Sequence, residues 1–150
     1  MTTITTEASL IAQRLALRRE IARESDRLYA QAEPLAQKLL QAYGKGEQGP
    51  TQIRNLENLA YTTDRLSDVY DLLKRQIGRS APSQHWRFEG VGQEVLDALA
   101  GLSEPARLIA NRLKAADPDL PRQVHLMLIR EYVKHLAAHY LYVRGQEPRQ

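Results

Sequence analysis

Apolar residues recur at three- and four-residue intervals along most of the chain, which is the spacing of one face of an α-helix. The clearest case follows the stretch GPTQIRN, residues 49–55. The pattern predicts one helix over residues 51–77, with Thr51 as its N-cap and Gly78 just beyond its end. Its apolar seam keeps heptad spacing throughout: Leu56, Leu59, Thr63, Leu66, Tyr70, Leu73 and Ile77.

Further helices are predicted between prolines, glycines and capping residues. Glu33-Pro34 is expected to separate the first two, because the residue before a proline avoids the helical conformation. Ser103 and Asp119 are expected to cap the last two, and Gly145 to end the final one. The predicted ranges are 6–32, 34–43, 93–100, 103–116 and 121–143.

The stretch GRSAPSQHWRFEGVG, residues 78–92, has no helical period and contains several helix breakers. We expect a long connection here, since most connections in compact domains are much shorter. Trp86 beside Phe88 either anchors this loop in the core or offers rings for base stacking, and packing is the commoner role of such residues.

Leu, Ala, Gln, Glu and Arg dominate the chain, β-branched residues are sparse, and no stretch alternates strictly as a half-buried strand does. The prediction is therefore an all-α fold, a compact bundle of about five to six helices. Residues 1–150 are expected to form a single domain, with residues 1–6 and 146–150 as flexible ends. Short connections favour antiparallel packing of neighbouring helices.

Composition narrows the class of protein. The chain has 150 residues, 43% hydrophobic and 26% charged, which suits one globular core. It has no cysteine, so disulfides, thiolate metal sites and a catalytic cysteine are excluded. No apolar run approaches the roughly 20 residues of a membrane span. The N-terminus lacks the layout of a secretory signal, so we expect a cytoplasmic protein without membrane contact.

Catalytic motifs are hard to find. His135 and His139 lie four apart in HLAAH, as metal-binding histidines do, but the glutamate of the zinc-protease pattern is missing. A structural role for both is favoured, and a small metal enzyme remains the competing interpretation. No nucleophile elbow, phosphate-binding glycine loop or paired inward carboxylates are present. We therefore expect a non-enzyme without metal or cofactor.

Basic residues offer the better lead, although the net charge is only +3. If residues 51–77 form one helix, a single face opposite the apolar seam carries Arg54, Asn58, Tyr61 and Arg65. Two guanidiniums, an amide and an aromatic ring suit phosphates, ribose hydroxyls and stacked bases. The competing interpretation is a solvated face with a half-buried tyrosine.

Two further basic groups are candidates for the same partner. Lys74, Arg75 and Arg79 close the predicted helix, where the helix dipole alone also favours cations. Arg130 and Lys134 lie four apart on the last helix and either contact a polyanion or only solvate the surface.

Three stretches together resemble a known family. GPTQIRN resembles the Thr-Ser-x-Ile-Arg-Asn signature of the small helical subunit of type III CRISPR effector complexes. PARLIANR, residues 105–112, resembles that family's proline-led helix ending in Arg. REYVKHLAAHYLYVRG, residues 130–145, resembles its final helix. Residues 72–88 have no counterpart and the first forty residues match nothing specific, which indicates a divergent member.

The resemblance implies a non-catalytic subunit that acts in antiviral defence. Copies of it would stack as a filament beside the backbone and large subunits of the effector. Their basic faces would hold the CRISPR RNA and target RNA backbone without reading sequence. Arg54 corresponds to the arginine of the signature, and Arg112 to the arginine that ends the second motif. The alternative is a helical protein–protein adaptor or dimerisation module whose apolar seam binds a partner helix.

Overall fold

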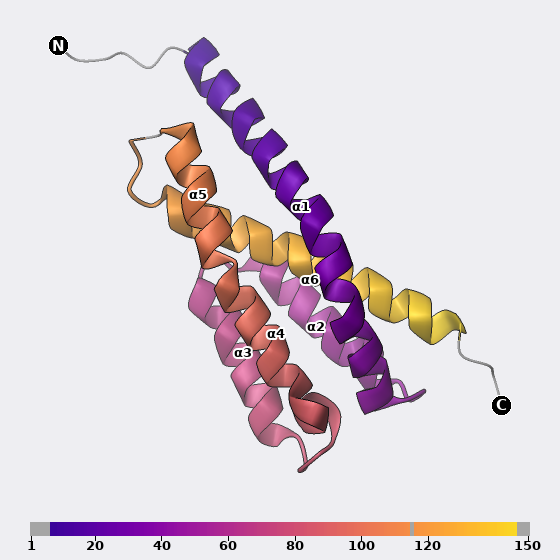
Figure 1. Ribbon diagram of the computed structural model, residues 1–150. Coiled ribbons are helices and arrows are strands. Elements are labelled where there is room, and N and C mark those ends of the chain that lie inside the picture. The colour runs from indigo at the N-terminus through magenta and orange to yellow at the C-terminus, as the bar shows by residue number, and fades with distance from the viewer. Residues whose placement is uncertain (1–6, 115, 147–150) are drawn as a thin grey trace.

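A computed structural model describes residues 7–114 and 116–146, which form six α-helices and one 3-10 helix without a strand (Figure 1). This confirms the all-α bundle. Of the predicted flexible ends, residues 1–6 and 147–150 lie outside the described residues, whereas Gln146 belongs to the last helix. The elements are α1 (Glu7–Tyr43), α2 (Gln48–Thr62), α3 (Leu66–Arg79), η1 (His85–Gly90), α4 (Val91–Gly101), α5 (Ser103–Leu113) and α6 (Leu120–Gln146).

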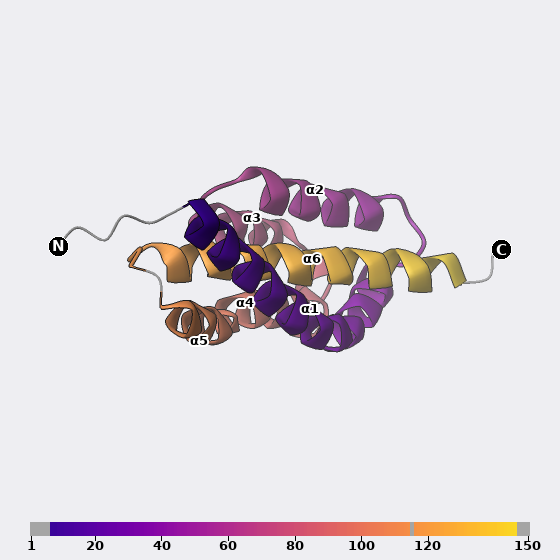
Figure 2. The ribbon, with the colours of Figure 1, turned by 90° about the horizontal axis from the view of Figure 1, so that it is seen from above.

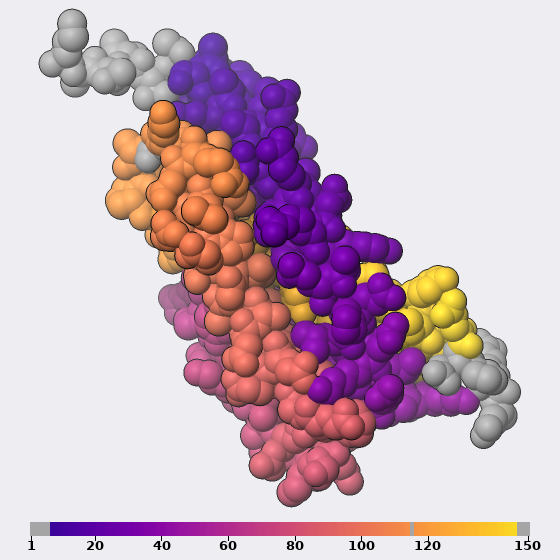
Figure 3. Space-filling view, in the orientation of Figure 1, coloured from indigo at the N-terminus to yellow at the C-terminus, as the bar shows by residue number. Residues whose placement is uncertain are grey.

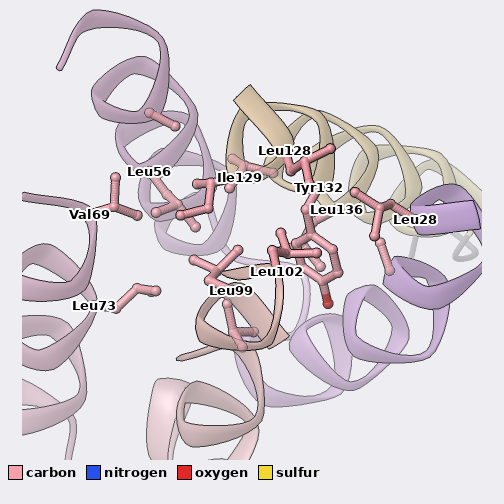
Figure 4. Packing of buried hydrophobic residues seen from close by; sticks show 14 of the residues in the cluster. Leu28, Leu56, Val69, Leu73, Leu99, Leu102, Leu128, Ile129, Tyr132 and Leu136 are labelled. Atoms are coloured by element: carbon pink, nitrogen blue, oxygen red, sulfur yellow. The ribbon is translucent and has the colours of Figure 1, made fainter. Parts of the chain in front are cut away.

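Helix α6 lies at the centre of the bundle. Figure 2 shows α2 on one side of it and α5 on the other, while α1 crosses it, and α1 makes the most extensive contact with it. Helix α6 buries a wide face, on which Leu128, Ile129, Tyr132 and Leu136 lie, and a broad apolar face of this kind belongs in a core. These side chains meet the buried leucines of α1, α2 and α4 in Figure 4.

Helix α1 runs unbroken for 37 residues through Pro34, so the predicted break at Glu33-Pro34 is wrong. A proline inside a helix costs about 3 kcal/mol. The turns on either side of it bury Leu28, Ala32 and Leu39 almost completely. Because each fully buried leucine contributes about 1.5–3 kcal/mol, the packing of this half of α1 outweighs the proline.

The predicted helix over residues 51–77 is divided in the structure. Helix α2 ends at Thr62, residue 63 is extended, and α3 begins at Leu66, so the heptad seam spans two helices. Helix α2 also begins earlier, at Gln48, and Thr51 is therefore not its N-cap. The Thr51 hydroxyl instead donates to the carbonyl of Glu47 at 3.0 Å.

Hydrogen bonds to the turn at residues 63–65 explain the division. Thr63 Oγ1 donates to Asp68 Oδ2 at 2.5 Å and accepts the N–H of Arg65 at 3.0 Å. From α6, Arg130 donates to the carbonyls of Ala60 and Thr63 at 2.8 and 3.0 Å. The carbonyls at the end of α2 thus find partners outside the helix, and continuing the helix would gain little.

The predicted loop over residues 78–92 is largely ordered. Helix α3 continues through Gly78 to Arg79, and η1 and the start of α4 occupy residues 85–92. Trp86 is 1% exposed, which confirms the loop anchor and leaves no ring face for a base. Phe88 is half-buried beside it.

Three smaller expectations about helix ends also differ. Helix α5 has Leu102 at its N-cap position and Ser103 inside it. Asp119 precedes α6, but its carboxylate accepts from the side chains of Arg122 and Gln123. Helix α6 continues past Gly145. Although α1 and α6 have the length of a membrane span, no helix among the described residues is apolar enough to cross a bilayer.

Candidate nucleic-acid interface

The outer side of α2 carries an exposed polar stripe. Arg54, Asn58 and Tyr61, which we call the α2 stripe, follow one another at the spacing of a single helix face, and all three are exposed. The opposite side of α2 is buried and carries Ile53, Leu56 and Ala60. Figure 2 shows α2 at the edge of the bundle, which leaves the stripe accessible.

Arg54 is free for a partner. Its guanidinium forms no hydrogen bond or ion pair with any residue in the ranges 7–114 and 116–146. It lies in the second turn of α2. The unpaired guanidinium can donate hydrogen bonds to a phosphate.

Helix α6 adds a cation beside the stripe. Tyr61 is 48% exposed, and partial burial raises the pKa of its phenol, with Lys134 lowering this pKa and Glu131 raising it. Lys134 Nζ lies 2.7 Å from Glu131 Oε2, which raises the lysine pKa. The phenol therefore stays protonated at neutral pH and can donate a hydrogen bond. Nothing in the sequence links Lys134 to Tyr61, because they come together only in the packed bundle.

Arg65 does not share the helix face of the α2 stripe, so the predicted four-residue face is wrong. Arg65 is the N-cap residue of α3 with extended backbone, φ −114° and ψ 120°. A single helix through residues 54–65 would have placed it one turn beyond Tyr61. It remains exposed, at the turn between the two helices.

The other predicted cations divide into two groups. Lys74, Arg75 and Arg79 are exposed on α3 and have no salt-bridge partner among the described residues. Arg112 instead forms hydrogen bonds to Glu20 Oε2 on α1 at 2.7 and 3.2 Å, and this contact lowers the pKa of Glu20. Arg130 caps α2. Because the guanidiniums of Arg112 and Arg130 already hold helices together, we leave both out of the candidate interface.

Sequence reasoning also missed the role of Arg122. Its Nη1 donates to the carbonyl of Asp64 at 2.7 Å, so Arg122 and Arg130 both reach the turn at residues 63–65 from α6. Their spacing along α6 puts them on one helix face, which was a readable signal. What they contact could not be read from that spacing, since the turn itself was not expected.

The histidines of α6 are engaged in packing. His135 Nε2 lies 2.8 Å from Ser25 Oγ, and His139 Nε2 donates to the carbonyl of Tyr29 at 2.7 Å. The Tyr29 ring packs against both imidazoles. In the part of the chain that the structure describes, no three His, Cys, Asp or Glu side chains could hold a metal together. The geometry thus agrees with the structural role favoured for both histidines.

We predict that His135 makes the stability of the fold pH-dependent. Burial and the neighbouring Lys134 and His139 lower the imidazole pKa from 6.5, against the opposing effects of Glu131 and Ser25. The folded state thus binds fewer protons than the unfolded state just below this pH, so stability is full above about pH 6.5 and falls as the pH drops through the lowered value. Urea unfolding of the natural chain and His135→Gln between about pH 7.5 and 5.5 tests this. The difference in the free energy of unfolding between the natural chain and His135→Gln should shrink on acidification, to the disadvantage of the natural chain. A difference that stays constant or grows would contradict this prediction.

Comparison of the chain with models of known protein families, with curated proteins and with solved structures gives no match. Any assignment of function therefore depends on the residues described above.

Proposed function

We propose that this protein is a non-catalytic small subunit of a type III CRISPR effector ribonucleoprotein, and that its α2 stripe contacts the RNA backbone. The observation that carries the proposal is the position of Arg54. It belongs to the GPTQIRN stretch that resembles the family signature, it is exposed, and it has no described partner.

The chemistry of the interface favours backbone contact over base reading. The α2 stripe and Lys134 supply a guanidinium, an ammonium, an amide and a phenol, all of which can donate to phosphate or ribose oxygens. Such contacts are independent of sequence and weaken steeply with salt. Lys74, Arg75 and Arg79 would extend the positive surface onto α3.

The remaining parts of the proposal concern the assembly. The chain would act in the cytoplasm in antiviral defence, with the guide and target RNA, the backbone and large effector subunits and further copies of itself as partners. Purification from the native host tests this directly. Recovery of a short RNA with several large subunits would support the proposal, whereas an RNA-free homodimer would count strongly against it.

A sharper test uses the purified chain and Arg54→Ala. We expect about tenfold weaker binding of a guide–target RNA duplex at moderate salt and a slope of log affinity against log salt that is smaller by about one. The melting temperature should not change, because exposed substitutions without partners rarely alter stability. Arg107→Ala is the matched control, since Arg107 is exposed on α5 and paired with Glu104 at 2.5 Å. Unchanged RNA affinity of Arg54→Ala would reject the assignment of the α2 stripe.

The adaptor alternative loses its original basis. It required the heptad seam to be exposed, but Leu56 and Leu73 are buried in the core. A seam that packs inside its own bundle cannot bind a partner helix.

A further inference from the structure

The N-terminal half of α1 lies largely outside the core, and its Leu17 and Ile21 only pack against the core's edge. None of the residues 7–24 is buried, and the first buried position of the helix is Ser25. At 1.5 Å per residue this segment is about 27 Å long. Figure 1 shows it reaching beyond the ends of the other helices, and Figure 3 shows it running beside the end of α5.

This segment also exposes large apolar side chains. Leu10, Ile11 and Leu15 are 43%, 51% and 46% exposed. Apolar side chains grouped on such a helix mark a surface that another protein covers.

Two grooves flank the segment. The first, of about 350 Å³, lies between α1 and the α5–α6 connection, and Leu10, Leu17, Leu113 and Leu120 line it. The second, of about 280 Å³, lies between α1 and α6, with Leu17, Ile21 and Met127 in its lining. Apolar side chains make up half of the lining of the first groove and most of that of the second, which suits the apolar face of an amphipathic helix.

Each groove is lined by one arginine and one carboxylate, Arg14 with Asp117 in the first and Arg18 with Glu131 in the second. Glu131 pairs with Lys134, and Asp117 accepts the backbone N–H of Asp119, so the unpaired charges are mainly guanidiniums. Arg14 lines the first groove and Arg18 the second, and neither has an ion-pair partner among the described residues; the same holds for Arg19. The nearby carboxylates of Glu20 and Glu24 are already engaged, with Arg112 and Arg27. Unpaired guanidiniums beside an apolar groove favour a partner with acidic residues flanking its apolar stripe.

We propose that residues 7–24 of α1, together with Leu113 of α5 and Leu120 of α6, form a docking site for an acidic amphipathic helix of a protein partner. A second copy of the chain fits less well, because pairing the same surface would bring Arg14 and Arg18 against arginines of like charge. RNA fits less well because the lining of the grooves lacks an aromatic platform. This site is separate from the α2 stripe.

The test measures fluorescence polarisation of two labelled helical peptides with the intact chain. Both carry leucines at helical spacing, and their polar faces are glutamate-rich in one and lysine-rich in the other. We expect saturable binding of the glutamate peptide at micromolar concentration and at least tenfold weaker binding of the lysine peptide. The double substitution Arg14→Glu with Arg18→Glu should reverse this preference, because the guanidiniums select the charge.

Contact with the groove is tested with Leu10→Ser, which should weaken binding of the glutamate peptide at least fivefold. Leu141→Ser is the matched control, since Leu141 is 54% exposed on α6 and lines neither groove. Arg54→Ala should leave peptide binding unchanged. Failure of the docking-site proposal can therefore be distinguished from failure of the RNA assignment of the α2 stripe. The absence of saturable binding, or equal binding of both peptides, overturns the proposal. Displacement of the glutamate peptide by single-stranded RNA also overturns the proposal and assigns the surface to RNA. Dimerisation of the chain that Leu10→Ser abolishes overturns it as well and assigns the surface to a second copy.

Discussion

Gly49→Ala is expected to lower the free energy of unfolding by about 2 kcal/mol, the usual cost of overpacking a filled core. Gly49 is buried in the first turn of α2, and a methyl group there would overlap the Tyr140 hydroxyl and lie 2.9 Å from Tyr43 Cβ. Both neighbours are held between packed helices and cannot move away freely. For a chain of this length the loss corresponds to a melting temperature lower by about 4–8 °C, which calorimetry or thermal circular dichroism would detect.

A double-mutant cycle identifies the cause of this loss. The Tyr140 hydroxyl is buried and has no hydrogen-bond partner among the described residues, so Tyr140→Phe alone should cost little. Combined with Gly49→Ala it should recover about half of the loss, because contact with Tyr43 remains. Gly78→Ala is the matched control. It has open space at its Cβ and should stabilise α3 by about 0.5–1 kcal/mol. Additive effects in the cycle would show that the overlap does not cause the loss.

Arg130→Met is expected to lower the free energy of unfolding by about 1.5–3 kcal/mol, the range for hydrogen bonds that involve a charged group. Methionine keeps an apolar stem for packing but cannot donate to the carbonyls of Ala60 and Thr63. These carbonyls at the end of α2 would then lack their partner, and the turn at residues 63–65 would loosen. Urea denaturation measures the loss, and hydrogen exchange should localise it to the end of α2 and the start of α3.

The control for Arg130 is Lys74→Met, which removes an exposed cation of α3 without a described partner. Its effect on stability should stay within about 0.5 kcal/mol. Measuring RNA affinity for both variants separates the two roles considered for Arg130. If Arg130→Met has the same urea unfolding midpoint as the natural chain yet binds RNA poorly, Arg130 belongs to the interface. Its hydrogen bonds to the end of α2 are then dispensable for stability.

The spacing of apolar and polar residues predicted the structure correctly where no contact with a distant part of the chain changed it. The spacing of apolar residues identified the helical character of the chain and the amphipathic faces of α2 and α3. It also placed Leu56 inward and Arg54 outward, because neighbours on one helix keep their relative directions whatever the rest of the chain does. For the same reason Asn58 and Tyr61 remain with Arg54 in the candidate interface.

Local pattern failed at contacts between distant parts of the chain. Pro34 stays inside α1 because this helix packs along α6, and the helix expected over residues 51–77 turns because two arginines of α6 bind its carbonyls. Because of this turn, Arg65 does not lie on the helix face predicted for it. Arg130 and Arg112, similar in sequence to the free cations, became structural through partners 67 or more positions away.

The sequence alone determined that this protein is helical, which sides of its helices are apolar, and that Arg54 points away from the core, since these properties depend on neighbours within a few residues. Only the tertiary structure decided where helices continue or end, which cations remain free, and that the start of α1 lies largely outside the core. The physical reason is that a proline, a carbonyl or a guanidinium can be compensated by a group far away in the chain, and folding brings that group within hydrogen-bonding distance.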